Sequence, residues 1–266
     1  MTTFFQFSDF HILPEKDMNR DEGNPCDKIE KVIQIARETK IKPAFSIITG
    51  DISQNGSDKG YKIAQEYMSQ IEALGGPVLP AVGNVDDRQR FRENLLEEAT
   101  TEKENPCYYS KTIDGVHIIV LDSQSPGKVT GALEGEQLDW LEKQLSNKKE
   151  PTIIALHHPP FKLPLPNGAS HTVFDLEDME RFNNLVESSN VNAVLCGHMH
   201  QSLITHRDGV NCVIGCAVLS EVIFGMKEYM TYDSSGFTMY TLRGGTLTVR
   251  PIIYTEGSRL VNTVSL

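Results

Sequence analysis

Short apolar runs rich in β-branched residues alternate along the chain with longer segments in which apolar residues recur every three or four positions. The short runs predict buried strands, and the longer segments predict amphipathic helices. Up to residue 196 the predicted strands cover 3–8, 45–53 (a run that breaks at Gly50), 77–82, 152–156 and 192–196, with a hairpin at 108–113 and 116–121. The predicted helices cover 27–40, 60–74, 88–98, 133–145 and 176–187.

Strands that alternate with helices predict parallel pairing in an α/β protein. From residue 203 onward the pattern changes to short β runs at 203–206, 211–214, 236–242 and 247–253, with turns at Asp208-Gly209 and Gly244-Gly245. These runs are predicted to form a second, mostly antiparallel sheet. We expect residues 1–266 to form one domain, with a β-rich portion from about residue 201.

Residues that can bind metal ions follow five of the predicted strands. They are Asp9, His11, Asp51, Asn84, His157, His198 and His200. Each signal alone also fits ordinary turn chemistry. Because the carboxyl ends of parallel strands meet at one edge of a sheet, however, we expect these side chains to lie together. In extended backbone, residues two apart point the same way, which predicts that Asp9 with His11, and His198 with His200, face one side.

Seven ligands exceed the needs of one ion but suffice for two ions that share Asp51. In this hypothesis one ion is also bound by Asp9, His11 and His200. The other ion is also bound by Asn84, His157 and His198. Carboxylate, imidazole and amide oxygen together suit Mn, Fe or Zn, so a divalent or trivalent pair is expected without a choice among them. Two ions about 3.5–4 Å apart clamp a phosphoryl centre and generate hydroxide at neutral pH.

The charge balance restricts the partners. Lys plus Arg number 25 against 36 acids, a net charge of −11, which argues against long nucleic acids and anionic membranes and favours a small phosphodiester or nucleotide. Five scattered cysteines without a CxxC pair predict reduced thiols in the cytoplasm, and no export signal or membrane-spanning run is visible. The apolar stretch 218–224 fits a homodimer surface or packing within the monomer equally well.

The ordered motifs resemble those of the calcineurin-like metallophosphoesterase superfamily: Asp9-x-His11, Gly50-Asp51, Gly83-Asn84, His157-x-Pro159 and Gly197-His198-x-His200. Finer features, such as Gln137-Leu-Asp-Trp-Leu141 and Gly236-Phe237, are similar to its class III cyclic-nucleotide phosphodiesterase branch, which includes glycerophosphodiesterases. The resemblance implies the metallophosphoesterase fold, a four-layer α/β/β/α sandwich of two mixed β-sheets flanked by helices. It also implies that His11, Asn84 and His200 contact the substrate phosphate.

The activity that the resemblance implies is hydrolysis of a phosphodiester by hydroxide held between the two metal ions. The expected substrate is a cyclic nucleotide, such as 3′,5′-cAMP, or a glycerophosphodiester. A phosphomonoesterase or a nuclease is a weaker interpretation, because the acidic chain shows no basic groove.

One position departs from the family pattern. The family motif continues Gly-Asn-His followed by an acid, whereas this chain has Val85 after Asn84. In the family that histidine contacts the phosphate and protonates the leaving alkoxide, and general acid catalysis contributes about 10²–10⁴-fold. The catalytic acid is therefore unassigned, with His158 and His171 as candidates. The alternative hypothesis is a catalytically weak, metal-containing nucleotide sensor or partner-binding domain.

Overall fold

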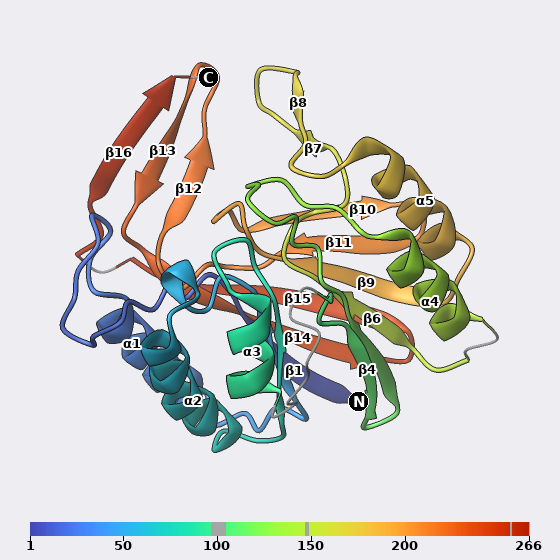
Figure 1. The fold of residues 1–266 in the computed structure, drawn as a ribbon, viewed down its shortest axis with the longest axis horizontal. Helices are drawn as coiled ribbons and strands as arrows, with labels where there is room; N and C mark the ends of the chain where they lie inside the picture. Colours follow the sequence, from blue (N-terminus) through green and yellow to red (C-terminus); the bar gives the residue numbers. More distant parts are fainter. Residues whose placement is uncertain (97–104, 147–148, 256, 266) are drawn as a thin grey trace.

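The computed structural model describes residues 1–96, 105–146, 149–255 and 257–265 (Figure 1). The N-terminal part is a parallel β-sheet with connecting helices: β1 (Thr2–Phe7), α1 (Pro25–Glu38), β2 (Ser46–Thr49), η1 (Gln54–Gly56), α2 (Asp58–Glu72), β3 (Val78–Ala81) and α3 (Arg88–Leu95). β1 pairs in parallel with β2, and β2 with β3, so their carboxyl ends share one edge, as predicted. Residues 97 and 98 of the helix predicted at 88–98 lie outside the described residues.

Two C-terminal strands complete this first sheet. β14 (Ser235–Arg243) pairs antiparallel with β1, and β15 (Thr246–Tyr254) pairs antiparallel with β14. Within the described ranges the strand order is β15-β14-β1-β2-β3. The helices α1, α2 and α3 cover its outer face (Figure 1), where Phe5 and Ile48 of the sheet share an apolar cluster with Ile33, Tyr67 and Phe91 of the helices.

The second sheet is also mixed. It contains β4 (Tyr109–Ile113), β5 (Val116–Val120), β6 (Thr152–Ala155), β9 (Val191–Cys196), β10 (Leu203–Arg207) and β11 (Val210–Ile214), in the order β10-β11-β9-β6-β5-β4 among the residues described. β5, β6, β9 and β11 are parallel neighbours. The helices α4 (Gly135–Leu145) and α5 (Leu176–Glu187) pack on its outer face (Figure 1).

The prediction of a separate antiparallel sheet from residue 203 onward was wrong. β11 pairs in parallel with β9, and β14 pairs with β1, so the four predicted strands are shared between the two sheets. The hydrophobic pattern shows which residues are extended, but the choice of a partner strand depends on tertiary packing, which the local pattern does not contain.

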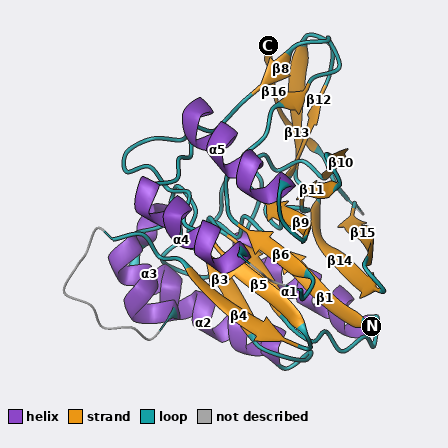
Figure 2. Ribbon diagram, turned by 90° about the vertical axis from the view of Figure 1, so that its right-hand side faces the viewer, coloured by secondary structure: helices purple, strands orange, loops and turns teal. Residues whose placement is uncertain are grey.

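The two sheets pack face to face through a third apolar cluster. Phe4 and Ile47 of the first sheet meet Ile118, Ile153 and Leu195 of the second. The resulting order of helix, sheet, sheet and helix is the expected four-layer α/β/β/α sandwich (Figures 1 and 2). None of the described helices has the length and hydropathy that a membrane span requires.

Five short strands were not predicted. β12 (Glu221–Phe224), β13 (Glu228–Tyr232) and β16 (Leu260–Ser265) form a three-stranded sheet, and β7 (Leu163–Pro164) pairs with β8 (Ser170–His171). Both units extend from the same end of the sandwich (Figure 1). The apolar stretch 218–224 divides between two environments, because Val218 and Leu219 are buried within the monomer whereas Ile223 is exposed on β12.

Candidate metal centre

The seven candidate ligands meet where the carboxyl ends of the two sheets approach each other. They follow five strands: Asp9 and His11 follow β1, Asp51 follows β2, Asn84 follows β3, His157 follows β6, and His198 and His200 follow β9. They form two groups on either side of Asp51, which we call the Asp9 group (Asp9, His11 and His200) and the Asn84 group (Asn84, His157 and His198). This is the division on which the two-ion hypothesis depends.

The Asp9 group converges on one side of the Asp51 carboxylate. His11 Nε2 lies 3.1 Å from His200 Nε2 and 3.5 Å from Asp51 Oδ2. His200 Nε2 lies 3.5 Å from Asp9 Oδ1. Asp9 is held from the second sheet, because the backbone N–H of His198 donates to its Oδ1 at 3.1 Å.

The Asn84 group converges on the other side. Asn84 Oδ1 lies 3.0 Å from His157 Nε2 and 2.9 Å from His198 Nδ1. The two ring nitrogens are 3.2 Å apart, and His157 Nε2 lies 3.3 Å from Asp51 Oδ1. Asp51 therefore presents one oxygen to each group.

Hydrogen bonds on the outer side of the rings show which nitrogens face inward as acceptors. His157 Nδ1 donates to the carbonyl oxygen of Thr49 at 2.7 Å, and His11 Nδ1 donates to Gln54 Oε1 at 2.8 Å. Because a carbonyl oxygen only accepts, each ring carries a proton on Nδ1 and presents Nε2 to its group, and this Nε2 offers a lone pair when the ring is neutral. Ligand atoms about 2.1 Å from one ion and about 90° apart are separated by about 3.0 Å. The separations of 2.9–3.2 Å between the inward-facing ligand atoms of each group thus fit atoms that bind one cation.

Five of these seven residues have a left-handed backbone. The φ angles are 56° at Asp9, 49° at His11, 51° at Asp51, 70° at His198 and 49° at His200. A residue other than glycine pays roughly 1–3 kcal/mol for this conformation. The premise of extended backbone was therefore wrong, because the chain turns at these positions. Asp9 and His11 still enter one group as expected, whereas His198 and His200 enter different groups, through Nδ1 and Nε2 respectively.

Two glycines allow the strand ends to touch. A Cβ on Gly83 would lie 2.1 Å from the backbone nitrogen of Asp51, and a Cβ on Gly197 would lie 2.0 Å from Ser8 Oγ and 2.9 Å from Asp9 Oδ2. Either contact would push a ligand-bearing loop away. At Gly197 the backbone thus approaches the loop that carries Asp9.

The electrostatics favour positive charge beside Asp51. Burial lowers the pKa of His157, but the carboxylates of Asp51 and Asp9 outweigh this effect and raise the pKa to about 9. Burial raises the pKa of Asp51, but His157 and His11 hold it well below its usual range. Burial, with the charge of His157, lowers the pKa of His198 to about 3, and burial lowers the pKa of His200. His198 and His200 are therefore in the neutral form that binds metals, whereas His157 carries a proton at neutral pH that a bound cation must displace.

Asp86 connects the loops that carry Asp51 and Asn84. Its buried carboxylate accepts hydrogen bonds of 2.9–3.1 Å from the N–H groups of Ile52, Ser53 and Gly83 and from the Tyr61 hydroxyl. Burial and the charge of Asp51 raise the pKa of Asp86 to about 6, although the hydrogen bonds from backbone N–H groups lower it. At neutral pH the Asp86 carboxyl group is therefore ionised and accepts these hydrogen bonds.

Replacing Asp86 with alanine is expected to lower the free energy of unfolding by about 3 kcal/mol or more, since each buried donor left without an acceptor costs about 1–3 kcal/mol. Urea unfolding of the metal-free proteins measures this loss. Asp87→Ala is the matched control: it removes the neighbouring carboxylate, which caps α3 by accepting from Arg90 N–H at 2.9 Å, and is expected to cost about 1 kcal/mol. Equal losses in the two variants would contradict the connecting role of Asp86.

The two candidates for the missing acid lie in different environments. His158 is fully buried, its ring is centred 4.8 Å from that of His157, and its Nδ1 lies 2.9 Å from Ser123 Oγ. His171 is exposed on β8 and makes no hydrogen bond or ion pair with either ligand group in the described part of the chain. His158 is therefore not accessible to a substrate, and His171 has no hydrogen bond or ion pair with the ligand groups among the residues described. The catalytic acid stays unassigned.

The sequence analysis missed the side chains that hold the imidazoles from outside. Gln54 Oε1 lies 2.8 Å from His11 Nδ1, and Ser220 Oγ lies 2.8 Å from His200 Nδ1. Gln54 gave a weak signal through its place three residues after Asp51. Ser220 gave none, because it belongs to a segment that comes close to His200 only in the folded chain.

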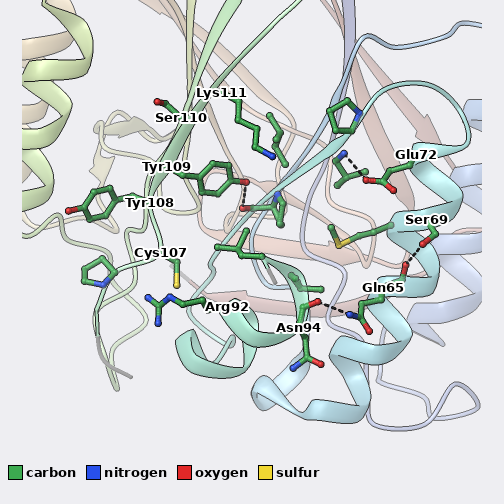
Figure 3. Close-up of a pocket in the computed structure, with 18 residues that line it drawn as sticks. Gln65, Ser69, Glu72, Arg92, Asn94, Cys107, Tyr108, Tyr109, Ser110 and Lys111 are labelled. Carbon is green, nitrogen blue, oxygen red and sulfur yellow. Dashed lines mark hydrogen bonds between the residues drawn. The ribbon is translucent and has the colours of Figure 1, made fainter. Parts of the chain in front are cut away.

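A pocket of about 670 Å³ lies elsewhere, between α2, α3 and β4 (Figure 3). Its polar groups bond to the chain itself: Gln65 Nε2 donates to Asn94 O at 2.7 Å, and Tyr109 Oη donates to Pro80 O at 2.9 Å. Its described lining residues include none of the seven candidate ligands. The candidate metal ligands therefore lie outside this pocket, at the edge where the two sheets meet.

The chain is similar in sequence to known proteins. Residues 2–202 match the family described as calcineurin-like phosphoesterase. The chain is 32% identical over 197 residues to a probable cyclic nucleotide phosphodiesterase of Rhodococcus erythropolis, covering 73% of this chain and 64% of that protein. It is 31% identical over 204 residues to a probable glycerophosphodiester phosphodiesterase GpdQ of Arcobacter nitrofigilis, covering 74% and 71%.

A solved structure shares the fold at lower identity. The dimetal phosphatase from Danio rerio superposes with a TM-score of 0.61 at 15% identity and covers 86% of this chain and 95% of its own. At this identity the likeness shows the fold alone. The match to the Rhodococcus protein spans less than two thirds of that protein's length.

Proposed function

Because the chain belongs to the calcineurin-like phosphoesterase family, we propose that it is a metal-dependent phosphodiesterase that hydrolyses a cyclic nucleotide, such as 3′,5′-cAMP, or a glycerophosphodiester. The observation that carries the proposal is the pair of ligand groups on either side of Asp51, with ring nitrogens of four histidines facing inward. The names of the Rhodococcus and Arcobacter relatives support these two substrate classes. The net charge of −11 disfavours long nucleic acids.

In this proposal each ligand group holds one ion and Asp51 contacts both. Two divalent ions supply positive charge for phosphoryl oxygens and lower the pKa of water. The chain's own residues fix where those ions bind, because Thr49, Gln54 and Ser220 hold three of the imidazoles from outside. Mn, Fe and Zn all accept this ligand set.

The accessible ligands are proposed to meet the phosphate. The side chains of Asp9 and His157 are 0% exposed and that of Asp51 is 5% exposed, whereas His11 is 8% and His200 16% exposed. Asn84 is also partly exposed, as is His198. A phosphodiester anion thus approaches imidazole and amide groups rather than buried carboxylates, which favours its binding electrostatically. Exposure alone would include His198 and does not favour His11, which is buried, so the proposal of phosphate contacts for His11, Asn84 and His200 rests on the family resemblance.

Val85 favours a second candidate function. Its N–H donates to Asp51 Oδ1 at 3.0 Å, which places an isopropyl group where the family pattern has an imidazole. An isopropyl group donates no proton to a leaving alkoxide, and neither His158 nor His171 takes that place in the structure. The second candidate is a metal-containing nucleotide sensor or partner-binding domain with weak turnover.

A substrate panel distinguishes the two functions. Protein reconstituted with Mn(II) is expected to hydrolyse bis-p-nitrophenyl phosphate readily, and 3′,5′-cAMP, 2′,3′-cAMP or a glycerophosphodiester more slowly, since nitrophenolate leaves without protonation. EDTA is expected to abolish turnover, and Mn(II) to restore it. If elemental analysis finds two ions per chain but no compound in the panel is turned over, the sensor is the better account.

A further inference from the structure

The segment 218–222 joins the root of the three-stranded sheet to the Asp9 group. Its backbone donates three hydrogen bonds: from Val218 to Ser8 O at 2.9 Å, from Leu219 to Asp9 O at 3.2 Å, and from Val222 to His200 O at 2.6 Å. Two of these acceptors belong to candidate ligands. The segment, which we call the brace, therefore fixes the backbone of Asp9 and His200 relative to each other, although β1 and β9 belong to different sheets.

Ser220 extends this support to a side chain. Its hydroxyl is buried, with the residue 2% exposed, and its Oγ lies 2.8 Å from His200 Nδ1. His200 Nε2 faces His11 Nε2 at 3.1 Å, and the Gln54 contact leaves that His11 nitrogen without a proton. If Ser220 Oγ accepts a hydrogen bond from the Nδ1–H of His200, the His200 Nε2 lone pair also points into the Asp9 group. This is the tautomer that binds a cation there.

The brace is itself anchored from α1. Lys28 Nζ donates to Leu219 O at 2.6 Å and also to Asp233 O, which precedes β14. Burial lowers the pKa of Lys28 to about 8, although Asp233 and Glu22 oppose this effect. A lysine that gives two of its donors to backbone carbonyls in a partly buried site restricts the chain that carries those carbonyls. Lys28 makes no hydrogen bond to any of the seven ligands among the described residues.

We propose that the brace is a positioning element for the Asp9 group, in which Ser220 holds His200 as its Nδ1–H tautomer and Lys28 fixes the backbone of the brace. The inference rests on the proposed metal-binding function. Neither residue touches substrate. Outer partners of metal-binding histidines typically change metal affinity or activity by about 10–100-fold when they are removed.

Ser220→Ala tests the side-chain part. We expect the variant to bind Mn(II) about 10–100-fold more weakly in chelator competition, and to lose the Nδ1–H signal of His200 in the ¹⁵N spectrum of the metal-free protein. Ser220→Thr keeps the hydroxyl and is expected to recover most of the affinity. Ser46→Ala is the matched control: this serine of β2 is also buried, but its hydroxyl makes no hydrogen bond among the described residues and it lies outside the brace. Thermal unfolding of the metal-free variants checks that each is folded.

Lys28→Met tests transmission through the brace. It is expected to weaken Mn(II) binding in the same direction by a smaller factor. Lys31→Met is its control, since Lys31 lies on the same helix but packs over the Tyr254 ring at 4.9 Å. Affinities within about twofold of wild type in both Ser220→Ala and Lys28→Met would overturn the inference. If the affinities change as expected but wild-type protein cleaves no phosphodiester, the inference stands and the proposed activity fails.

Discussion

Replacing Val85 with histidine is expected to raise the turnover number for substrates with alkoxide leaving groups, such as 3′,5′-cAMP and glycerophosphodiesters, by about 10²–10⁴-fold. The reason is local, because the Val85 N–H donates to Asp51 Oδ1 and so fixes the backbone of this position beside the shared carboxylate. The side chain is partly exposed, which leaves room for a ring that reaches the substrate. Steady-state kinetics with Mn(II)-loaded protein measures the change.

The leaving group provides the internal control for this substitution. Nitrophenolate needs no proton, so bis-p-nitrophenyl phosphate is expected to gain far less than the cyclic nucleotide. Val85→Gln is the matched variant, since it adds a polar side chain that donates a hydrogen bond but supplies no titratable proton. A similar gain on both kinds of substrate, or an equal gain in the glutamine variant, would show that the lack of an imidazole at position 85 does not limit turnover.

Asp51→Asn is expected to have the other large effect. The amide keeps the size of the carboxylate and its contact with Val85 but removes the charge that lies 3.5 Å from His11 Nε2 and 3.3 Å from His157 Nε2. Because both ligand groups lose the same carboxylate, both ions are expected to be lost together, with a fall in turnover well beyond the ~100-fold upper range for outer partners. Elemental analysis and the bis-p-nitrophenyl phosphate assay measure the two losses.

Asp87→Asn is the control for that experiment. Asp87 is a neighbouring carboxylate that caps α3 and contacts no imidazole of either group within the described ranges. It is expected to keep both ions and near-normal turnover. An Asp51→Asn protein that still holds two ions per chain would refute the sharing of Asp51, whatever its activity.

The sequence was informative where the chemistry is local. The runs before Asp9, Asp51 and Asn84 are parallel neighbours, and parallel order alone brings those side chains to one edge. Family resemblance added the layered architecture. The direction of each side chain was not predictable in this way, because Asp9 and His200 have left-handed backbones that follow from contacts between two sheets.

The partners of the ligands were hidden for the same reason. Ser220 meets His200 only after β12 has been placed, and Asp86 acts through four donors from three separate segments. The pairing of β11 with β9 and of β14 with β1 was equally invisible, since strands of similar composition compete for the same sheet edges. Local pattern thus predicted the candidate ligands but not the residues that hold them in place.

The pairing of β1 with β14 has a consequence for biosynthesis. Thr2 lies opposite Leu242, so β1 is synthesised about 240 residues before the strand that pairs with it on this side. Until then one side of β1 is an open edge, and non-local pairing of this kind is slow to form and prone to aggregation. Residues 2–202, which carry every proposed ligand, do not include that neighbour. The β1 strand that leads to Asp9 is therefore expected to gain its second neighbour only after residue 243 has been synthesised.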